Sequence, residues 1–318
     1  MEGVSHELEF CLAQVDDFEQ VMSISVNIYN GLDYLPDRYH RWLKDPYRRV
    51  ILAKKEGKVV ALVSVSVVDD GHTALVEGLR VAPSERGQGI AGRIQRYALA
   101  LIKSQFPSLE VRRYARIGKL SPDVFTEFRL ICSQEVLVLH FVAEELQPLL
   151  DTTIGHLKAS RQEWEEPIHL AAGEVKQVFL DRRVVEEVLP GGTIIRDWIP
   201  YKPSEGNLEV LLKRGTTWMA DSVVDPTVLS LCSSPYKVPA GANNFRLNID
   251  IFGKDFLRAR SQFLAQLHKA IDFLQGPTYC LIYLDKTIWS IMHSFCQTVF
   301  SLTNEIVLEK QWVLEAEF

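Results

Sequence analysis

The sequence contains no Gly-Lys-Ser or Gly-Lys-Thr tripeptide, no excess of basic residues and no closely spaced pair of cysteines. The first absence excludes a P-loop nucleotide-binding protein. The formal net charge of −6 argues against nucleic-acid binding, because nucleic-acid-binding proteins present a basic patch or domain. The five cysteines form no Cys-x-x-Cys pair and the eight histidines show no His-x-x-x-His spacing, so we expect neither a metal site nor a disulfide framework.

Long hydrophobic runs are missing as well. The first ten residues, MEGVSHELEF, lack the basic stretch and apolar run of a signal peptide. The longest apolar stretch, Val59 to Val68, is interrupted by serines and is far shorter than the ~20 residues that a membrane-spanning helix needs. We therefore expect a cytoplasmic protein without a membrane or nucleic-acid partner.

The composition is that of an ordinary globular protein, with 47% hydrophobic and 24% charged residues. The 318 residues suffice for two domains of roughly 100–200 residues each. The order strand, glycine-containing turn, long helix, strand, helix, strand occurs in both halves and predicts a duplicated α+β fold. A polar, charged stretch interrupts this pattern between the halves. We therefore predict domains at 1–147 and 167–318, joined by a linker at 148–166.

Hydrophobic spacing and turn signals locate the main elements. A loosely helical apolar spacing predicts a helix from Asp16 through Tyr29. The run Thr73 to Val81 predicts a strand, and the amphipathic stretch that starts near Gly89 predicts a long helix after it. In the second half we predict strands at Leu208 to Lys213 and at Phe245 to Phe252, the latter with clean alternation of apolar and polar residues.

Three glycines crowd the turn between the predicted strand and the long helix, in Arg86-Gly87-Gln88-Gly89-Ile90-Ala91-Gly92. They let the backbone approach a ligand closely, and the helix directs its unpaired N–H groups and positive dipole end at that ligand. A diphosphate suits such a site, and Arg86 can add a charge-assisted contact. Gly87, Gly89 and Gly92 have the spacing Gly-x-Gly-x-x-Gly, but no suitable acidic residue follows downstream, which argues against a Rossmann dinucleotide site.

The segment Arg86-Gly87-Gln88-Gly89-Ile90-Ala91 matches the R/Q-x-x-G-x-G/A loop of the GNAT acetyltransferases, and Leu79-Arg80-Val81-Ala82-Pro83 matches the strand before it. The sequence thus resembles this family over about residues 7–142. Asn30-Gly31-Leu32-Asp33-Tyr34-Leu35-Pro36, Glu77-Gly78-Leu79-Arg80-Val81 and the long second half resemble, more closely, the vertebrate histidine N-acetyltransferase family.

The resemblance implies tandem GNAT-like domains, each a central mixed β-sheet flanked by helices. It implies acetyl-CoA as co-substrate and free L-histidine as acceptor, whose α-amine attacks directly in a ternary complex to give N-acetylhistidine and CoA. The turn Phe252-Gly253-Lys254-Asp255 has one glycine and an acidic residue where the diphosphate would lie, so we expect the second domain to lack a working cofactor loop. The residues implied to bind acetyl-CoA are Leu79, Arg80, Val81, Arg86, Gly87, Gln88, Gly89, Ile90, Ala91 and Gly92.

Three residues are candidates for catalysis. Glu77 is placed where the family often has its general base, acting directly or through water, and Gly78 beside it permits a β-bulge. The alternative for Glu77 is an ion pair with Arg80 or another basic group. The backbone N–H of Val81 would stabilise negative charge on the thioester oxygen. The tyrosine that the family often uses to protonate the thiolate is replaced by Phe128, which leaves Tyr114 as a candidate acid or as an ordinary strand tyrosine.

Asp33, Tyr34 and Arg80 are candidates for binding the substrate, together with Glu77. Asp33 and Tyr34 could hold an imidazole or ammonium group and Arg80 a carboxylate. Their alternatives are a turn residue, a packing residue and a contact to CoA or the surface, respectively. Two other functions stay open at this point. One is a protein, peptide or other small-amine N-acetyltransferase, and the other is a CoA-binding pseudoenzyme, which the missing tyrosine would favour.

Overall fold

The computed structural model describes residues 7–160, 163–241, 243–300 and 310–318. Within these residues the chain forms two compact units. The first comprises the chain up to Tyr114 together with Val238–Gly241 and Glu315–Phe318, and the second comprises Ala115–Lys237 and the chain from residue 243 to Leu314. The predicted linker, 148–166, includes most of one helix, α5 (Ala143–Ala159).

The first unit is built on a sheet with the strand order β1-β2-β3-β4-β5. Neighbouring strands are antiparallel except β4 and β5, which are parallel. The strands are β1 (Glu9–Leu12), β2 (Arg48–Lys55), β3 (Lys58–Val68), β4 (Thr73–Val81) and β5 (Val111–Ile117). The helices are α1 (Phe18–Ser23), α2 (Leu35–Leu43) and α3 (Ile90–Gln105), with 3-10 turns η1 (Val15–Asp17), η2 (Ile28–Gly31), η3 (Asp69–Gly71) and η4 (Pro83–Glu85).

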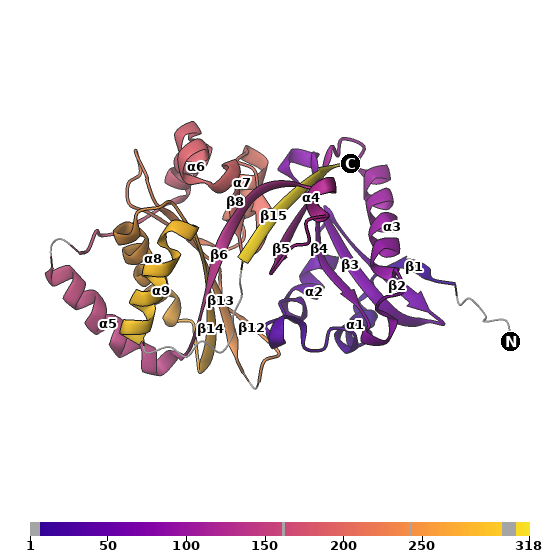
Figure 1. Cartoon of the computed structure of the whole chain (residues 1–318), viewed down its shortest axis with the longest axis horizontal. Coiled ribbons are helices and arrows are strands. Elements are labelled where there is room, and N and C mark those ends of the chain that lie inside the picture. Colours follow the sequence, from indigo (N-terminus) through magenta and orange to yellow (C-terminus); the bar gives the residue numbers. More distant parts are fainter. Residues whose placement is uncertain (1–6, 161–162, 242, 301–309) are drawn as a thin grey trace. The chain divides into compact units, whose positions relative to one another are not determined.

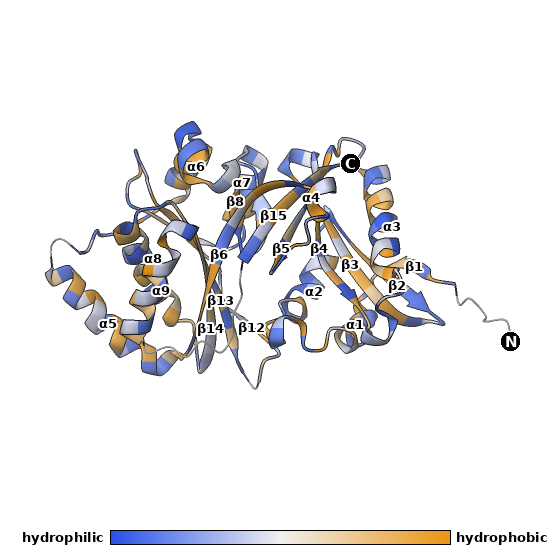
Figure 2. Ribbon diagram, viewed as in Figure 1, coloured by the Kyte–Doolittle hydropathy of each residue, from blue (hydrophilic) through white to orange (hydrophobic). Residues whose placement is uncertain are grey.

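Helices cover both faces of this sheet. In Figure 1, α3 lies along one face, and α1 and α2 lie across the other. Accordingly, β3 is buried from Val59 to Val67, as expected of a strand that is packed on both sides, and Figure 2 shows it predominantly hydrophobic. The predicted stripe of α3 faces the sheet, since Ile90, Ile94 and Ile102 are all buried. This packing fixes the ends of β4 and α3, between which the predicted cofactor loop lies.

The second unit has the strand order β15-β6-β14-β13-β11-β10-β7, with β12 attached to β13 and a separate β8–β9 hairpin. Its strands β13 and β14 are parallel. The strands are β6 (Arg129–Val142), β7 (Ile168–His169), β8 (Ile194–Arg196), β9 (Ile199–Tyr201), β10 (Thr217–Ala220), β11 (Leu229–Cys232), β12 (Tyr236–Lys237), β13 (Phe245–Phe252), β14 (Pro277–Leu284) and β15 (Lys310–Glu317). The helices are α4 (Val124–Glu127), α5, α6 (Ala172–Leu180), η5 (Val184–Val188), η6 (Pro190–Gly192), α7 (Glu205–Leu212), α8 (Phe256–Ile271) and α9 (Lys286–Phe300).

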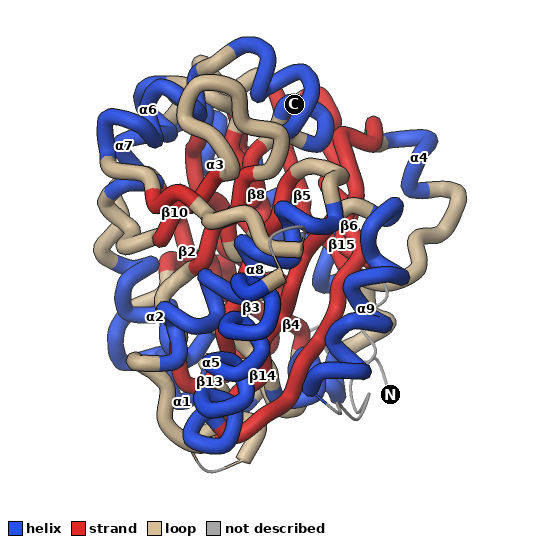
Figure 3. The backbone as a smooth tube through the Cα atoms, turned by 90° about the vertical axis from the view of Figure 1, so that its left-hand side faces the viewer, coloured by secondary structure: helices blue, strands red, loops and turns tan. Residues whose placement is uncertain are grey.

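The two faces of β13 have different surroundings. Leu247, Ile249 and Ile251 belong to one hydrophobic core together with residues of α5, α8 and α9, which lie over this side of the sheet in Figure 3. The alternating residues Asn248 and Asp250 are equally buried but polar. The predicted strand Phe245 to Phe252 and its alternation are confirmed. Both units are therefore mixed sheets flanked by helices, and the α+β class is confirmed.

Two predictions of secondary structure are wrong. The predicted strand Leu208 to Lys213 is helix α7, because Ser204 caps a helix by accepting a hydrogen bond from the Asn207 N–H. The predicted helix from Asp16 through Tyr29 ends as an α-helix at Ser23. Beyond it, Asn27, Tyr29 and Asn30 adopt left-handed conformations, which asparagine tolerates better than most residues. Among the described residues, no helix combines the length and apolar character needed to cross a membrane.

Candidate active site

The predicted cofactor loop connects the end of β4 to the start of α3. Gly87 and Gly89 have φ angles of +79° and +72°, and a Cβ added to either would meet no atom within 4 Å. The chain therefore needs glycine at these positions for the left-handed backbone and not for lack of space. Among the described residues, no side chain caps the N-terminus of α3 at Gly89. The first N–H groups of a 16-residue helix thus remain available to an anion.

The loop borders a hollow of about 470 Å³. Leu79 and Arg80 of β4, Pro83 and Arg86 of the loop, and Val26 to Tyr29 of the segment after α1 line it. Arg86 holds the loop against the strand, since its Nε donates to the Val81 carbonyl oxygen at 3.2 Å. The hollow is large enough for part of a cofactor-sized ligand, and Arg86 gives it positive charge.

A β-bulge interrupts β4 at Gly78. Ser64 lies opposite Glu77 and Leu62 opposite Arg80, so β4 has one residue more than β3 in this interval. Gly78 has a φ of +71°, and a Cβ there would lie 2.9 Å from the ring of Trp42. The bulge that the sequence suggested is therefore present, and it requires glycine for both conformation and space.

The bulge coincides with the end of the pairing between β4 and β5. The parallel ladder runs from Thr73 to Val76 and stops directly before Glu77. Past this point the outer edge of β4 is left for another partner. Val81 lies opposite Ala61, next to a hydrogen-bonded pair in which the Ala82 N–H donates to the Val60 carbonyl oxygen. Because such pairs alternate in antiparallel strands, the Val81 N–H points away from β3, toward the open edge.

Glu77 is held by Arg48, a residue that sequence reasoning did not identify. Arg48 Nη2 donates to Glu77 Oε2 at 2.8 Å, and its Nη1 donates to Ser64 Oγ at 2.7 Å. The guanidinium carbon also lies 4.6 Å from the centroid of the Trp42 ring. Arg48 is only 2% exposed and Glu77 14% exposed, so solvent reaches the carboxylate but not the cation that orients it. Glu77 thus forms an ion pair, but with Arg48 and not with Arg80.

Arg80 pairs instead with Asp33, across 47 residues of sequence. Arg80 Nη2 donates to Asp33 Oδ1 at 2.7 Å, and both side chains are 2% exposed. Asp33 Oδ1 also accepts from the Leu35 N–H at 3.1 Å, as a turn residue does. Among the described residues, Arg80 Nε and Asp33 Oδ2 have no partner, so a donor and an acceptor of this pair remain.

Two tyrosine rings pack against the Arg80 guanidinium. Its carbon lies 5.4 Å from the centroid of Tyr29 and 5.5 Å from that of Tyr34. Burial raises the pKa of the Tyr34 hydroxyl well above its usual range, so the phenol stays neutral. Burial opposes the charge on Arg80, but its surroundings, which include the paired Asp33 carboxylate, raise its pKa overall. Asp33, Tyr34 and Arg80 thus form one buried cluster, and the exposed Tyr29, which sequence reasoning missed, packs against it.

Tyr114, the candidate acid, is the last residue of the β4–β5 ladder, where it lies opposite Val76. Its side chain is 7% exposed and is therefore buried, close to the point where the two strands stop pairing. No group of three or more His, Cys, Asp or Glu residues with metal-binding geometry occurs in the described part of the chain.

The corresponding turn of the second unit connects β13 to α8 and has a different chemistry. The Asp255 carboxylate caps α8 by accepting from the Arg258 N–H at 3.1 Å. Gly253 has a φ of +107°, and a Cβ there would lie 2.2 Å from the Thr227 carbonyl oxygen. A carboxylate thus occupies the helix end at which a diphosphate would be expected, and the backbone is packed instead of open.

Comparison with known families and proteins gives consistent matches. Residues 16–116 match the model of the acetyltransferase (GNAT) family, and residues 163–285 match the model described as histidine N-acetyltransferase, C-terminal. The histidine N-acetyltransferase of Scomber australasicus is 43% identical over 317 residues, covering 98% of this chain and 94% of that protein. That of Xenopus tropicalis is 43% identical over 312 residues, with coverage of 98% and 96%.

Solved structures with low sequence identity share the architecture. A tandem GNAT protein from the clavulanic acid biosynthesis pathway superposes with a TM-score of 0.56 at 14% identity, covering 98% of each chain. A GCN5-related N-acetyltransferase from Sphaerobacter thermophilus gives a TM-score of 0.57 at 10% identity, covering 98% of this chain and 95% of that one. These similarities establish the fold, a tandem GNAT architecture.

Proposed function

The chain belongs to the histidine N-acetyltransferase family, and on this premise we propose that it transfers an acetyl group from acetyl-CoA to the α-amine of free L-histidine. That it is an acetyltransferase follows from its relatives, which match it over nearly the full length. The observation that carries the proposal is the open edge of β4 beyond Val76, directly before a glycine loop at an uncapped helix end.

In this proposal the first unit binds acetyl-CoA. The N–H groups at Gly87 to Gly92 and the start of α3 receive the diphosphate, with Arg86 adding a positive charge. Gln88, Ile90 and Ala91 belong to the same turn. The backbone of Leu79, Arg80 and Val81 binds the pantetheine arm as if it were an added strand. The chemistry that acetyl-CoA supplies is an activated acetyl group.

Glu77 then serves as general base. It accepts the proton that the substrate ammonium must lose before its nitrogen can form the new C–N bond, either directly or through a water molecule. Arg48 keeps the carboxylate aimed and partly exposed. The Val81 N–H, which points to the open edge of β4, would donate to the thioester oxygen as the amine adds to the carbonyl carbon and negative charge develops on that oxygen. Tyr114 is our candidate for the general acid that donates a proton to the leaving thiolate.

The cluster of Asp33, Tyr34 and Arg80 selects the substrate. Arg80 lines the hollow beside the loop and has a spare donor, which suits a carboxylate. Asp33 has a spare acceptor, which suits an imidazole N–H or an ammonium group. Tyr34 provides an aromatic surface next to both. A free amino acid with a polar ring presents these complementary groups together.

The proposal is tested by measuring the release of CoA thiol from acetyl-CoA with each free amino acid and with several N-terminal peptides. We expect turnover with histidine far above that with any other acceptor. Turnover with peptides alone would contradict the proposed substrate. Tight binding of acetyl-CoA without turnover on any acceptor would instead indicate a CoA-binding protein without this activity.

A further inference from the structure

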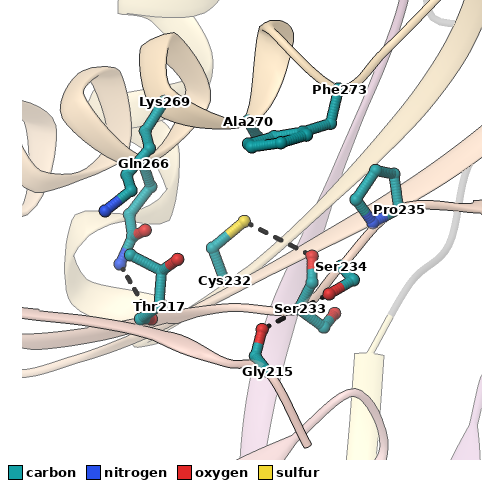
Figure 4. Close-up of a pocket in the computed structure, with 10 residues that line it drawn as sticks. All are labelled: Gly215, Thr217, Cys232, Ser233, Ser234, Pro235, Gln266, Lys269, Ala270 and Phe273. Carbon is teal, nitrogen blue, oxygen red and sulfur yellow. Dashed lines mark hydrogen bonds between the residues drawn. The ribbon is translucent and has the colours of Figure 1, made fainter.

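A second cavity, of about 440 Å³, lies wholly within the second unit. It is bounded by the C-terminal half of α8, by β10 and β11, and by the loop after β11 (Figure 4). Its volume is within the range of small-molecule sites. Among the described residues that line it, none belongs to the proposed active site and none is acidic.

Gln266 lines this cavity and carries a buried hydrogen-bond acceptor. Its Nε2 donates to the carbonyl oxygens of Thr217 at 3.3 Å and Ser230 at 3.2 Å. Carbonyl oxygens accept only, so these contacts fix which end of the amide is nitrogen. The residue is 1% exposed, and its Oε1 has no partner among the described residues. A buried acceptor without a donor is costly, so the cavity favours a ligand that brings an N–H or O–H group to it.

The walls near this acceptor are apolar and include an aromatic ring. Phe273 is 70% exposed, although large aromatic side chains are usually covered. Figure 4 shows its ring beside Ala270 on one side of the cavity, with Pro235 on the other side. Burial raises the pKa of the Cys232 thiol to about 12, so the thiol stays neutral and serves as wall and not as nucleophile. A flat ring fits this slot by stacking on Phe273.

A positive charge lies at the rim. The Lys269 ammonium contacts His169 Nε2 and forms no ion pair with a carboxylate among the described residues. Burial, and then Lys269 itself, lower the pKa of His169, so this imidazole is neutral and accepts from the lysine. The uncompensated charge attracts an anion and repels an ammonium group.

We propose that this cavity binds a small molecule whose flat ring bears an N–H donor and whose side chain ends in a carboxylate, without a free ammonium group. The ring stacks on Phe273, its N–H donates to Gln266 Oε1, and the carboxylate pairs with Lys269. If the proposed function holds, N-acetylhistidine has these groups whereas histidine still has its ammonium. The site then distinguishes product from substrate, outside the unit that performs the chemistry.

The test is calorimetric titration of the full chain with imidazole-4-acetate, N-acetylhistidine and histidine. Phe273→Ala should weaken the binding of the first two about tenfold, through the loss of stacking, and Lys269→Gln severalfold, through the loss of charge. Both side chains are exposed, so neither change should affect folding. Phe125→Ala and Lys213→Gln, at other exposed positions of the same unit, are matched controls that should bind like the original chain.

Equal affinity in all variants would overturn the proposed site, as would a crystal soaked with imidazole-4-acetate that shows only water at Gln266. If the chain binds imidazole-4-acetate but not N-acetylhistidine, the result would support the site and refute its occupation by the product. Because Phe273 and Lys269 lie outside the proposed active site, CoA release by Phe273→Ala should match that of the original chain. If the original chain shows no turnover with histidine, that result would count against the proposed function and not against the proposed site.

Discussion

The two units build the same strand-to-helix turn from different residues. The first turn follows β4 and the second follows β13, and each leads into a helix of 16 residues. In the first, two left-handed glycines leave the helix end uncapped among the described residues. In the second, the Asp255 carboxylate caps the helix, and Arg258 binds both Asp221 and Glu165.

The strands that precede the two turns also differ, in how far each pairs with its parallel neighbour. In the first unit the parallel ladder of β4 with β5 covers Thr73 to Val76 and ends at the bulge. In the second the parallel ladder of β13 with β14 continues from Phe245 to Asp250 without a break. One fold thus gives an open edge with a free helix end, or a closed edge with a capped one. If the proposed function holds, the capacity for a cofactor depends on a few residues at the turn and not on the architecture.

The difference between the two turns is tested most directly by giving the first turn a carboxylate like that of the second. Gly89→Asp puts a carboxylate at the start of α3, where it should cap the helix and repel the diphosphate. We expect the affinity for acetyl-CoA to fall by about 100-fold or more, because a carboxylate would then lie where the site binds the negatively charged diphosphate. Gly89→Asn is the matched control, because asparagine tolerates the left-handed backbone equally well but carries no charge. Similar losses in both variants would show that backbone strain, and not charge, is responsible.

A second prediction concerns Glu77, the proposed general base. Glu77→Gln should lower kcat about 100-fold near neutral pH and leave acetyl-CoA affinity unchanged. The deficit should narrow as the pH is raised, because more of the substrate amine is then already neutral. Glu110→Gln, at an exposed carboxylate of the same unit, is the control for the loss of one charge. A deficit that is constant across the pH range would contradict the assignment of Glu77 as base.

A third prediction concerns the bulge. Gly78→Ala places a Cβ 2.9 Å from Trp42 at a left-handed residue. It should destabilise the chain by about 1–3 kcal/mol and reduce turnover. Gly57→Ala is the control, because Gly57 has a φ of +75° but no atom within 4 Å of the added Cβ. Thermal unfolding of both variants separates strain, which they share, from the steric clash, which only Gly78→Ala has. Equal destabilisation would refute a steric role for Trp42.

The last prediction concerns the buried polar side of β13, which lies outside the proposed active site. Burial raises the pKa of the Asp250 carboxyl to about 8, despite a hydrogen bond from the Asp197 N–H, whereas an unfolded aspartate titrates near pH ~3.9. Between these values the folded chain retains a proton that the unfolded chain has released. Stability should therefore fall as the pH rises from about 4 to 8, by at most ~1.4 kcal/mol per pH unit.

Urea unfolding between pH 5 and 8.5 measures this dependence. Asp250→Asn should flatten the curve, since the amide does not titrate. Asp272→Asn, at an exposed position, should leave the curve unchanged. An identical slope in the original chain and in Asp250→Asn would contradict the buried, protonated state of this carboxyl.

Local patterns predicted the first turn well but not the partners of its side chains. The predicted bounds of β4, Thr73 to Val81, and of β13, Phe245 to Phe252, are confirmed. The predicted strand at Leu208 to Lys213 was wrong, because the helix cap at Ser204 determines the structure there. The Arg48–Glu77 and Asp33–Arg80 pairs join residues 29 and 47 positions apart. Such pairs form only when the sheet and α2 are assembled, so no local pattern reveals them.

The most direct test of the account is the number of acetyl-CoA molecules bound per chain, measured by calorimetric titration of the original chain and of Gly89→Asp. The account predicts one molecule per chain, and none at the same concentrations in the variant. Two molecules per chain, or one that Gly89→Asp does not remove, would contradict the division between an open first turn and a closed second turn.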